Sequence, residues 1–400
     1  MLKILCLTSH DMDGPDYGAA LRARNLFRLL AQLGKVRIVL ANPVDLGKEL
    51  GNKKTSTGGF ELAEVIGFQK TTRRPLTDRL RFEFDGRFLN TEWQQATAAD
   101  RERLQRLMSG HDLVWIHGLK VANGFGLWRW PNSILDIDDI PSDFHRSDMA
   151  QAKGIIQKLR RYRQTYLWRR REKNILERFD ALCVCSQADR KKLGGSDKIF
   201  VVPNGFGAPE KPSVRRPSIP PRIGFVGAFQ YRPNREGMNW FVQQVWPQIL
   251  RSIPQARLRL IGAGSENLQW PQDQNIDRLG FVQDVDSEMA TWSLSIVPVF
   301  VGGGTRIKIA ESFSRKCPIV STTMGAHGYG AVDGREMFLA DTVTDFSEKC
   351  LQILINPPIG KAMAEKGWQS FLENWTWDSF AGRVGEAVEY VLRRKIASHG

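Results

Sequence analysis

Short apolar runs alternate with helix-patterned segments along most of this 400-residue chain, and that alternation limits the possible folds more than any other feature. Near the start, for example, the apolar run Ile4–Leu7 is followed by the amphipathic stretch Ala19–Leu33. Uninterrupted apolar runs are typical of strands buried on both faces of a parallel sheet, and the helices between them form the crossover connections. The sequence therefore predicts an α/β protein built on doubly wound parallel sheets.

The expected strands form two sets, which are separated by a proline-rich segment. The first set is Ile4–Leu7, Val36–Leu40, Leu113–Ile116, Ile134–Ile137, Ala181–Cys185 and Phe200–Val202. The second set is Ile223–Val226, Leu258–Ile261, Ile276–Leu279, Leu294–Val299 and Pro318–Ser321. Residues 203–221, between the two sets, contain six prolines and no periodicity, which is typical of a linker.

We therefore expect a Rossmann-like N-terminal domain over residues 1–205, a linker over 206–221 and a Rossmann-like C-terminal domain over 222–376. The last segment, 377–400, has a helical pattern and is expected to cross back to the N-terminal domain. Open sheets of this kind bind ligands outside the carboxyl ends of their strands, so the two domains are expected to face each other across a cleft. Functional residues should then lie just after strands.

The net charge of +14 is concentrated in the N-terminal half. Residues 1–200 hold 35 Lys and Arg against 24 Asp and Glu, whereas residues 201–400 hold 22 against 19. This imbalance predicts an anionic partner for the N-terminal half. No apolar run approaches the ~20 residues that a helix needs to cross a bilayer, so an integral membrane protein is not expected. Five scattered cysteines match neither a disulfide framework nor a zinc site, and we expect a cytoplasmic location.

Basic residues are dense over residues 153–173, where apolar side chains recur at Ile155, Leu159, Tyr162 and Tyr166. This spacing predicts one face of a helix, with Lys and Arg over most of the remaining surface. Two interpretations stay open. The segment is either a surface helix whose charges are solvated, or a helix that lies on the anionic inner face of a membrane and guides a lipid-linked acceptor.

The strongest local signal comes where the run Leu294–Val299 leads into three glycines, Gly302, Gly303 and Gly304. A helix is expected to begin directly after them, at Thr305. Glycines let backbone amides approach a ligand closely, and the N–H groups at a helix start carry about half a positive charge. This order of elements favours binding of a phosphate group.

Charged residues in the first turns of that expected helix strengthen the prediction. Arg306 and Lys308 would oppose the helix dipole in the absence of an anion, so their placement indicates a pocket for a diphosphate. Glu311, one turn beyond Lys308, is placed to accept hydrogen bonds from a pair of sugar hydroxyls. The alternative is a flexible turn followed by a Lys308–Glu311 surface pair.

Two further strand-to-helix loops carry weaker signals of the same kind. The first loop ends at Gly18 and leads into a helix with Arg22 and Arg24. The second contains Gly227 and offers Arg232 to a phosphate. Each is equally consistent with a plain strand–helix connection. Neither matches GxGxxG with a later acidic residue, which disfavours a nicotinamide dinucleotide, and the absence of GxxxxGK[ST] excludes the P-loop phosphate hydrolases.

These motifs together resemble those of a known family. The run Val301–Glu311, followed by Pro318–Thr323, is similar to the donor-site signature of family 4 glycosyltransferases, which are retaining, two-domain sugar transferases of the GT-B fold. Further matches are Val226–Gly227, Pro233–Asn234, Gly237, Ile261–Gly264, Gly280–Asp284, Val184–Ser186, Val202–Gly205 and the loop that ends at Gly18. The resemblance covers almost the whole chain and implies the GT-B fold.

The resemblance implies roles for residues on the donor side. Glu311 matches the second glutamate of the family's paired-glutamate motif, which holds the nucleotide ribose. Gly303 stands in place of the first glutamate, as in a glycine-rich variant of the motif, so backbone amides are expected to contact the sugar hydroxyls. Ala228 and Glu236 occupy the positions of the family's basic pair. Three candidates are left to neutralise the diphosphate: Arg232, Arg235 and Arg306.

The resemblance also bears on the acceptor side. His117 follows an expected strand and resembles the family's N-domain histidine near the reacting sugar carbon; the alternative is a capping or core histidine. Asp138 and Asp139, at the end of the next strand, are expected to touch the acceptor or to cap the following segment. The Asp-x-Asp pattern there is the metal–diphosphate motif of a different glycosyltransferase fold, but one tripeptide is a weak signal, and no metal site is expected.

The expected function is that of a metal-independent, retaining glycosyltransferase of the hexosyltransferase type. It would move a sugar from a nucleotide-diphosphate sugar to a hydroxyl of a sugar or lipid-linked acceptor, in polysaccharide or glycolipid assembly, and no cofactor is expected. A non-catalytic GT-B binding protein and a nucleotide-sugar epimerase remain alternatives. A nucleic-acid binder is disfavoured, because the C-terminal half is nearly neutral and no binding module accompanies the charge.

Overall fold

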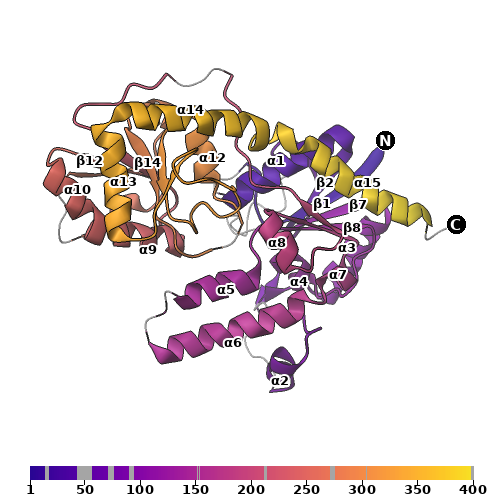
Figure 1. Ribbon diagram of the computed structural model, residues 1–400. Helices are drawn as coiled ribbons and strands as arrows, with labels where there is room; N and C mark the ends of the chain where they lie inside the picture. Colours follow the sequence, from indigo (N-terminus) through magenta and orange to yellow (C-terminus); the bar gives the residue numbers. More distant parts are fainter. Residues whose placement is uncertain are drawn as a thin grey trace. The chain divides into compact units, whose positions relative to one another are not determined.

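The computed structural model describes the chain in two compact units. It covers residues 1–13, 18–42, 56–70, 76–89, 94–150, 152, 154–210, 214–270, 275–302 and 304–397. Unit 1 combines Met1–Pro203 with Phe380–Gly400, and unit 2 is Asn204–Ser379. Each unit is an α/β layer structure with helices around a central sheet (Figure 1).

Unit 1 is built on an eight-stranded sheet with the order β10-β9-β8-β7-β1-β2-β4-β3. Its strands are β1 (Leu2–Thr8), β2 (Gly34–Ala41), β3 (Ser56–Thr57), β4 (Phe60–Ile66), β7 (Leu113–His117), β8 (Ser133–Ile137), β9 (Ala181–Val184) and β10 (Ile199–Val201). Neighbouring strands are parallel, except for the antiparallel pair of β3 and β4 at one edge. The strands β7, β8 and β9 are buried along their full length, which fits their apolar sequences.

The helices of unit 1 connect these strands and cover both faces of the sheet. They are α1 (Gly18–Leu33), α2 (Leu76–Phe84), α3 (Ala98–Ser109), α4 (Leu119–Phe125), α5 (Pro141–Ala150), α6 (Ile155–Glu172), α7 (Ile175–Arg178), α8 (Gln187–Lys192) and α15 (Ala381–Ala397). A small antiparallel pair, β5 (Gln69–Lys70) and β6 (Gln94–Gln95), completes the unit.

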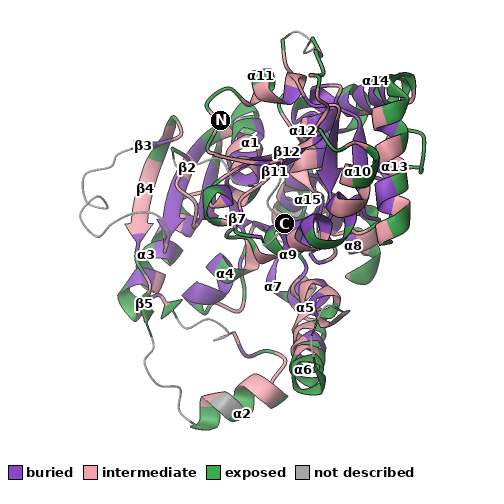
Figure 2. Cartoon of the chain, turned by 90° about the vertical axis from the view of Figure 1, so that its left-hand side faces the viewer, coloured by how far each residue is buried: buried purple, intermediate pink, exposed green. Residues whose placement is uncertain are grey.

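Two of these helices, α5 and α6, pack side by side as an antiparallel pair (Figure 1). Asp148, near the end of α5, forms an ion pair of 2.5 Å with Arg161 in α6. Ser142, at the start of α5, donates its amide to Glu172 at the end of α6, at 2.8 Å. Most of α6 is exposed, in contrast to the buried strands of the sheet (Figure 2).

Unit 2 is built on a six-stranded parallel sheet with the order β13-β12-β11-β14-β15-β16. Its strands are β11 (Arg222–Val226), β12 (Arg257–Ile261), β13 (Ile276–Gly280), β14 (Leu294–Val297), β15 (Ile319–Ser321) and β16 (Phe338–Leu339). Its helices are α9 (Arg232–Trp240), α10 (Trp246–Ser252), α11 (Val285–Ala290), α12 (Ile307–Ser314), α13 (Val343–Ile355) and α14 (Pro357–Asn374). A π-helical segment, Phe241–Val245, joins α9 to α10 and makes them one continuous helix.

The structure confirms the prediction of two doubly wound sheets. Every expected strand is observed, with ends that differ by at most two residues. The strands β3, β4, β5, β6 and β16 were not predicted. The helix expected from Thr305 begins two residues later, at Ile307, so Arg306 is its N-cap residue rather than part of its first turn.

The expected linker, 206–221, lies within unit 2 where it is described. The amide of Phe206 donates to the carbonyl of Trp375 at 2.9 Å. Further along, the amides of Arg216 and Ser218 donate to carbonyls at the end of α11, at 2.8 and 2.9 Å. The described parts of the segment are thus hydrogen-bonded to unit 2.

The last helix, α15, belongs to unit 1. The ring of Tyr390 lies 5.6 Å from the ring of Phe200 in β10, centroid to centroid. Lys395 extends from α15 to within 3.3 Å of the Asp112 carboxylate, just before β7. No described helix is both long enough and apolar enough to cross a membrane.

Candidate active site

The glycine-rich turn of unit 2 lies at the carboxyl end of β14, between that strand and α12. Gly302 has a φ of +132° and Gly304 a φ of +60°, both of which favour glycine. A β-carbon on Gly302 would lie 2.5 Å from Nη2 of Arg306 and 3.4 Å from the hydroxyl of Tyr231. Glycine at position 302 thus suits the positive φ and leaves room for the guanidinium of Arg306 in its observed place beside the backbone. Gly303 lies outside the described residues.

Two side chains hold the backbone at the start of α12. The hydroxyl of Tyr329 donates to the carbonyl of Arg306 at 2.8 Å and accepts from the amide of Ala310 at 3.2 Å. The hydroxyl of Thr305 accepts from the amide of Asn204 at 2.9 Å, and the Asn204 side chain donates to the carbonyl of Thr305 at 3.1 Å. Thr305 is buried, and its side chain thus positions the turn.

Lys308 extends from α12 toward the loop that follows β11. Its Nζ donates to Oδ1 of Asn234 at 2.8 Å, and Asn234 in turn donates to the carbonyl of Ala228 at 2.8 Å. The same Nζ lies 4.0 Å from the centroid of the Phe225 ring, and a β-carbon on Gly227 would lie 3.0 Å from it. Burial, together with the charge of Arg306, lowers the pKa of Lys308 to about 7, although Glu311 opposes this shift.

Glu311 lies one turn further along α12, and its side chain is only 14% exposed. Its carboxylate is 3.3 Å from Nη1 of Arg315, which also binds Asp286 at 2.5 Å. Burial raises the pKa of Glu311, while Arg315 and Lys308 oppose that shift. The surface pair of Lys308 with Glu311 that the sequence left open is not the observed arrangement, because Lys308 binds Asn234 and Glu311 pairs with Arg315.

Arg232 is the first residue of α9, whose start lies beside the same loop. Gly237 lets α9 come very close to the end of β14, because a β-carbon on it would lie 1.9 Å from the carbonyl oxygen of Pro298. Arg232 is partly exposed, with its Nε 3.7 Å from the Glu236 carboxylate, whereas Arg235 is exposed. Unit 2 therefore brings Gly227, Gly302, Arg306 and Lys308 together at the carboxyl ends of β11 and β14.

Sequence reasoning missed three residues of this site. Asn234 was noted without a role, and Tyr231 and Arg315 were not identified. Asn234 connects the β11 loop to Lys308, Tyr231 lies against Gly302, and Arg315 pairs with Glu311. The only sequence signal for Arg315 is its i, i+4 spacing from Glu311 on a helix.

In unit 1, His117 is the last residue of β7 and belongs to a buried network. Its Nδ1 lies 2.7 Å from Oδ2 of Asp136, in the neighbouring strand β8. Arg22, in α1, donates to both oxygens of Asp136 at 2.5 to 3.1 Å and to the carbonyl of Pro203 at 3.2 Å. Neither Arg22 nor Asp136 has measurable exposure, and His117 is nearly as buried.

The charges in this network determine which nitrogen of His117 carries a proton. Burial would raise the pKa of Asp136, but Arg22 and the hydrogen bond from His117 hold it below its usual value. An ionised carboxylate only accepts hydrogen bonds, so Nδ1 of His117 must be the donor and Nε2 is the nitrogen left for other partners. The ring of His10 lies 5.5 Å away, and burial, then His117, lowers the pKa of His10 to about 4, with Asp138 opposing.

This network corrects one sequence interpretation. The sequence carries a weak phosphate-type signal at the loop that ends at Gly18, with Arg22 and Arg24 in the helix that follows. Arg22, however, is fully buried and bound to Asp136. Gly18 is the first residue of α1, and residues 14–17 of its loop lie outside the described residues. Sequence reasoning considered Asp136 only as the first residue of the Asp-x-Asp pattern, although an aspartate inside the apolar run Ile134–Ile137 is also a signal for a buried, paired charge.

The two other acidic candidates lie just after β8. Asp138 is half-buried, and its Oδ1 accepts from the thiol of Cys185 at 3.2 Å. Asp139 is exposed, before the start of α5. Within the described ranges, no cluster of three or more His, Cys, Asp or Glu side chains could hold a metal ion.

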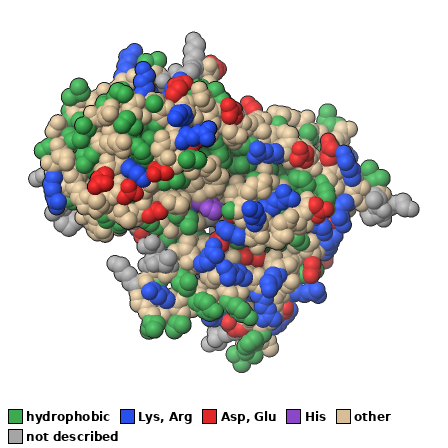
Figure 3. All heavy atoms as spheres, in the orientation of Figure 1, with side chains coloured by type: hydrophobic (Ala, Val, Ile, Leu, Met, Phe, Trp, Pro, Cys, Tyr) green, Lys and Arg blue, Asp and Glu red, His purple; other side chains and the backbone are tan. Residues whose placement is uncertain are grey.

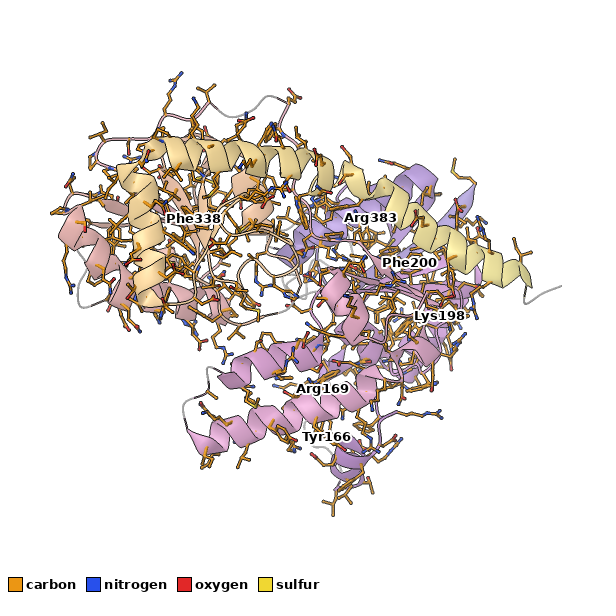
Figure 4. All side chains as sticks on the ribbon, viewed as in Figure 1. Tyr166, Arg169, Lys198, Phe200, Phe338 and Arg383 are labelled. Carbon is orange, nitrogen blue, oxygen red and sulfur yellow. The ribbon has the colours of Figure 1, made fainter. Side chains whose placement is uncertain are left out.

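Large apolar side chains project into solvent from two helices of unit 1, each between 52% and 74% exposed. We call them the α2–α6 surface: Leu76, Leu80 and Phe84 of α2, with Ile155, Ile156, Leu159, Tyr162 and Tyr166 of α6. The predicted stripe of α6 thus faces outward. The two helices are joined by a hydrogen bond of 3.0 Å from Arg163 to Glu83. Figure 3 shows apolar and basic side chains gathered over this region, and Figure 4 shows Tyr166 and Arg169 on α6.

Comparison with known proteins agrees with this architecture. Residues 220–356 match the family model described as "Glycosyl transferases group 1". A curated relative from Klebsiella pneumoniae, described as an uncharacterized 44.6 kDa protein in the cps region, is 23% identical over 161 residues, which are 38% of this chain and 42% of that protein. The chain thus spans less than half the length of that relative.

Solved structures resemble the whole chain. Sucrose-phosphate synthase from Thermosynechococcus elongatus has a TM-score of 0.66 at 14% identity, over 100% of both chains. Anabaena HepE in complex with UDP-glucose has a TM-score of 0.61 at 14% identity, over 97% of this chain and 100% of that one. WaaG, a glycosyltransferase involved in lipopolysaccharide biosynthesis, has a TM-score of 0.60 at 14% identity, over 97% and 99%. These likenesses confirm the predicted GT-B fold, and the matched family supports a glycosyltransferase.

Proposed function

We propose that the protein is a retaining glycosyltransferase that moves a hexosyl group from a nucleotide-diphosphate sugar to a hydroxyl acceptor. The proposal rests mainly on one observation: two cations, Arg306 and Lys308, lie close to the glycine-rich turn before α12. Two cations beside a helix N-terminus, at the carboxyl ends of β11 and β14, have the chemistry to bind a diphosphate. This turn also falls within the segment that matches the glycosyltransferase family model.

The cations would act most strongly on the leaving group. As the bond from the sugar to the diphosphate breaks, negative charge builds on the departing phosphate, and fixed cations and helix amides stabilise it. Lys308 suits this task because Asn234 holds its ammonium group in a partly buried position, and the attraction between opposite charges is stronger there than in bulk water. We therefore propose that the chain's own cations neutralise the diphosphate, without a metal ion.

Glu311 is proposed to bind the ribose of the nucleotide. A carboxylate accepts hydrogen bonds from two adjacent hydroxyls, and Arg315 holds that carboxylate in one orientation. The uridine nucleotides are the first donors to test, because HepE is described in complex with UDP-glucose. Glycine-rich backbone around Gly302 and Gly304 is proposed to contact the sugar hydroxyls.

His117 is proposed to act on the acceptor side, next to the reacting sugar carbon. Its Nδ1–H is fixed by Asp136, so Nε2 is the atom that would meet the substrate. In a retaining transfer the acceptor hydroxyl enters on the face that the leaving group departs from, and the departing phosphate takes the acceptor's proton. Asp138 and Asp139, after the neighbouring strand, are proposed to contact the acceptor sugar.

The acceptor is proposed to be lipid-linked or a growing polysaccharide at the inner face of a membrane. The α2–α6 surface combines exposed apolar side chains with exposed Lys158, Arg160, Arg163 and Arg170 on α6. An amphipathic helix with basic and aromatic residues binds at anionic lipid interfaces. WaaG, which is described as a glycosyltransferase involved in lipopolysaccharide biosynthesis, supports a glycolipid or polysaccharide acceptor.

The test is a transfer assay with a panel of nucleotide-diphosphate hexoses, run with and without lipid-linked acceptors. R306Q and E311Q are expected to lose at least about 100-fold in kcat/KM, the scale of a lost oxyanion donor, while R251Q, which changes an exposed arginine at the end of α10 in the same unit, stays near wild type. Epimerised donor without acceptor would identify an epimerase instead. Donor binding with no turnover for any pair would favour a binding protein.

A further inference from the structure

A small open pocket in unit 1 is not used by the proposed mechanism. Three parts of the unit form it: the segment after α2, the helix α4, and the junction of α6 with α7. Its lining is Gly86, Phe88, Leu89, Leu119, Asn123, Trp128, Trp168, Arg171, Glu172, Ile175 and Arg178. Two arginines and two tryptophans thus face one cavity.

Arg178 is the unusual member of this lining, because it is a buried cation that forms no ion pair with any acidic residue in the described part of the chain. Arg178 is only 5% exposed. Nη1 donates to Oδ1 of Asn123 at 2.9 Å and Nη2 to the carbonyl of Leu127 at 3.4 Å. Its Nε is buried and makes no hydrogen bond to any described residue. Burial lowers the pKa of Arg178 to about 10.

The guanidinium of Arg178 lies 5.7 Å from the Trp128 ring and 5.0 Å from the Phe179 ring, but no described carboxylate neutralises it, and this points to an anion as its further partner. A buried charge is normally paired or coordinated, because the desolvation of a lone ion is expensive. The acid in the lining, Glu172, does not supply the pair, because its carboxylate accepts from the amide and hydroxyl of Ser142 at 2.8 and 2.6 Å. Arg171 adds a second cation, stacked 4.3 Å from the Phe82 ring and 5.4 Å from the Trp168 ring.

We infer that this pocket binds a phosphate-type oxyanion, with Arg178 and Arg171 as its cationic ligands. Guanidinium groups suit this task because their planar N–H donors match the geometry of phosphate oxygens. The inference deepens the proposed function by adding an anion site to the acceptor unit, and it rests on that proposal for the source of the phosphate.

The place of the pocket in the chain suggests a lipid phosphate. Trp168 and Arg171 lie on α6 directly after the apolar stripe that ends at Tyr166, and residues 86–89 directly follow Phe84 of α2. The pocket is therefore built by the continuations of the two helices that carry the α2–α6 surface. A lipid whose chains lie on that surface would bring its phosphate toward these arginines; a soluble phosphate is the other source.

The test reads the pocket directly through its tryptophans. The full chain is labelled with 15N-tryptophan, and the indole signals of Trp128 and Trp168 are assigned with W128F and W168F among the twelve tryptophans. Titration with inorganic phosphate is expected to shift both signals with saturation. The shift is expected to persist in R306Q, which removes a proposed donor-site cation, and in R106Q, which changes an exposed arginine on α3.

The variants R178M and R171Q are expected to weaken phosphate binding at least 10-fold. Because Arg178 is buried, R178M can fail to fold, and the signals of the other tryptophans report whether it does. R171Q tests the pocket in that case. A dihexanoyl phosphatidate arm distinguishes the sources: binding at least 10-fold tighter than inorganic phosphate supports a lipid headgroup, and equal binding supports a soluble phosphate. Two results overturn the inference. The first is that neither probe shifts the indole signals of the wild type, and the second is that R178M and R171Q show the same shifts and affinities as the wild type.

These outcomes are separate from those of the proposed function. The indole signals report occupancy of the pocket whether or not any sugar is transferred. A wild-type protein that shows the shifts but no transfer with any donor contradicts the glycosyltransferase proposal alone. Transfer without the shifts contradicts the anion site alone.

Discussion

The Nδ1 atom of His117 lies 2.7 Å from Oδ2 of Asp136, and Arg22 binds the same carboxylate from α1. One buried aspartate thus fixes the orientation of the proposed acceptor-side histidine and also neutralises a buried arginine. The two roles join α1, β7 and β8 at the end of the unit 1 sheet where ligands are expected. Changing Asp136 should therefore affect both stability and transfer.

We predict that D136N lowers the free energy of unfolding by about 3–5 kcal/mol, the range for removing one partner of a buried ion pair. The amide would leave Arg22 buried without a countercharge. Urea unfolding of wild type and D136N measures the difference. The control is D138N, because Asp138 is half-buried and its change should cost less than about 1 kcal/mol. Equal losses in both variants would contradict the role assigned to Asp136.

The lowered pKa of Lys308 gives a prediction about how donor affinity depends on pH. Its pKa of about 7 in the free protein means that it loses its proton above that pH. A diphosphate binds the charged form, so binding above pH 7 requires proton uptake and becomes weaker as pH rises, by at most about tenfold per pH unit for one proton. Below pH 7 the ammonium is already formed, and this contribution to the affinity is flat.

Titration of the protein with the nucleoside diphosphate between pH 7 and 9 measures this slope, in a range where the terminal phosphate is almost fully ionised. K308M is expected to bind more weakly throughout and to lose the slope. R232Q is the matched control, because it removes a cation of the same unit and should keep the slope. A slope that survives in K308M would assign the titration to another group.

The sequence was sufficient where the signals are local. Apolar runs identified the buried strands, because a strand covered on both faces needs no polar positions. Glycines followed by basic residues identified the turn at Gly302 and Arg306, because both the backbone conformation and the charge of that turn depend on a few consecutive residues. The strand β4, which lies next to the two-residue edge strand β3, was missed because it is half-solvated and carries Glu61, which pairs with Lys35 at 2.9 Å, and so lacks an apolar run.

Pairings between distant residues could not be predicted in the same way. Arg22 and Asp136 are separated by 114 positions, and only the fold brings them together. The sequence did contain a signal for each, because Arg22 falls among the apolar positions of an amphipathic helix and Asp136 within an apolar strand. Charges at such positions are buried only when they are paired. A search for two such residues of opposite sign would have indicated the network.

The close packing of Arg306 on Gly302 gives a third prediction. G302A would place a methyl group 2.5 Å from Nη2 of Arg306, at a φ of +132° that alanine rarely adopts. We expect donor affinity to fall at least tenfold, because Arg306 must move, and stability to fall by about 1–3 kcal/mol from backbone strain. Isothermal titration with the nucleoside diphosphate and urea unfolding measure the two effects.

The control for this variant is G382A, on α15, where no atom lies within 4 Å of the added carbon. It should leave donor affinity unchanged. Wild-type affinity in G302A would mean that the position of Arg306 against the turn has no part in donor binding.

The α2–α6 surface gives a final prediction about membrane binding. The double variant L80S/L159S is expected to weaken binding to vesicles with anionic lipid by about 10- to 100-fold, because each leucine contributes roughly 1–2 kcal/mol when it leaves water. Its stability should stay within about 1 kcal/mol of wild type, since both side chains already face solvent. Vesicle co-sedimentation and urea unfolding measure the two quantities.

The matched control is L372S on α14 of unit 2, which changes a leucine that is 46% exposed and lies outside the α2–α6 surface. It should bind vesicles as wild type does. Basic residues of α6 add an electrostatic part, so binding should also fall with rising salt and with neutral lipid. If L80S/L159S bound vesicles as tightly as wild type, the α2–α6 surface would not be the membrane contact. If binding were equal for neutral and anionic vesicles, the basic residues of α6 would have no part in it.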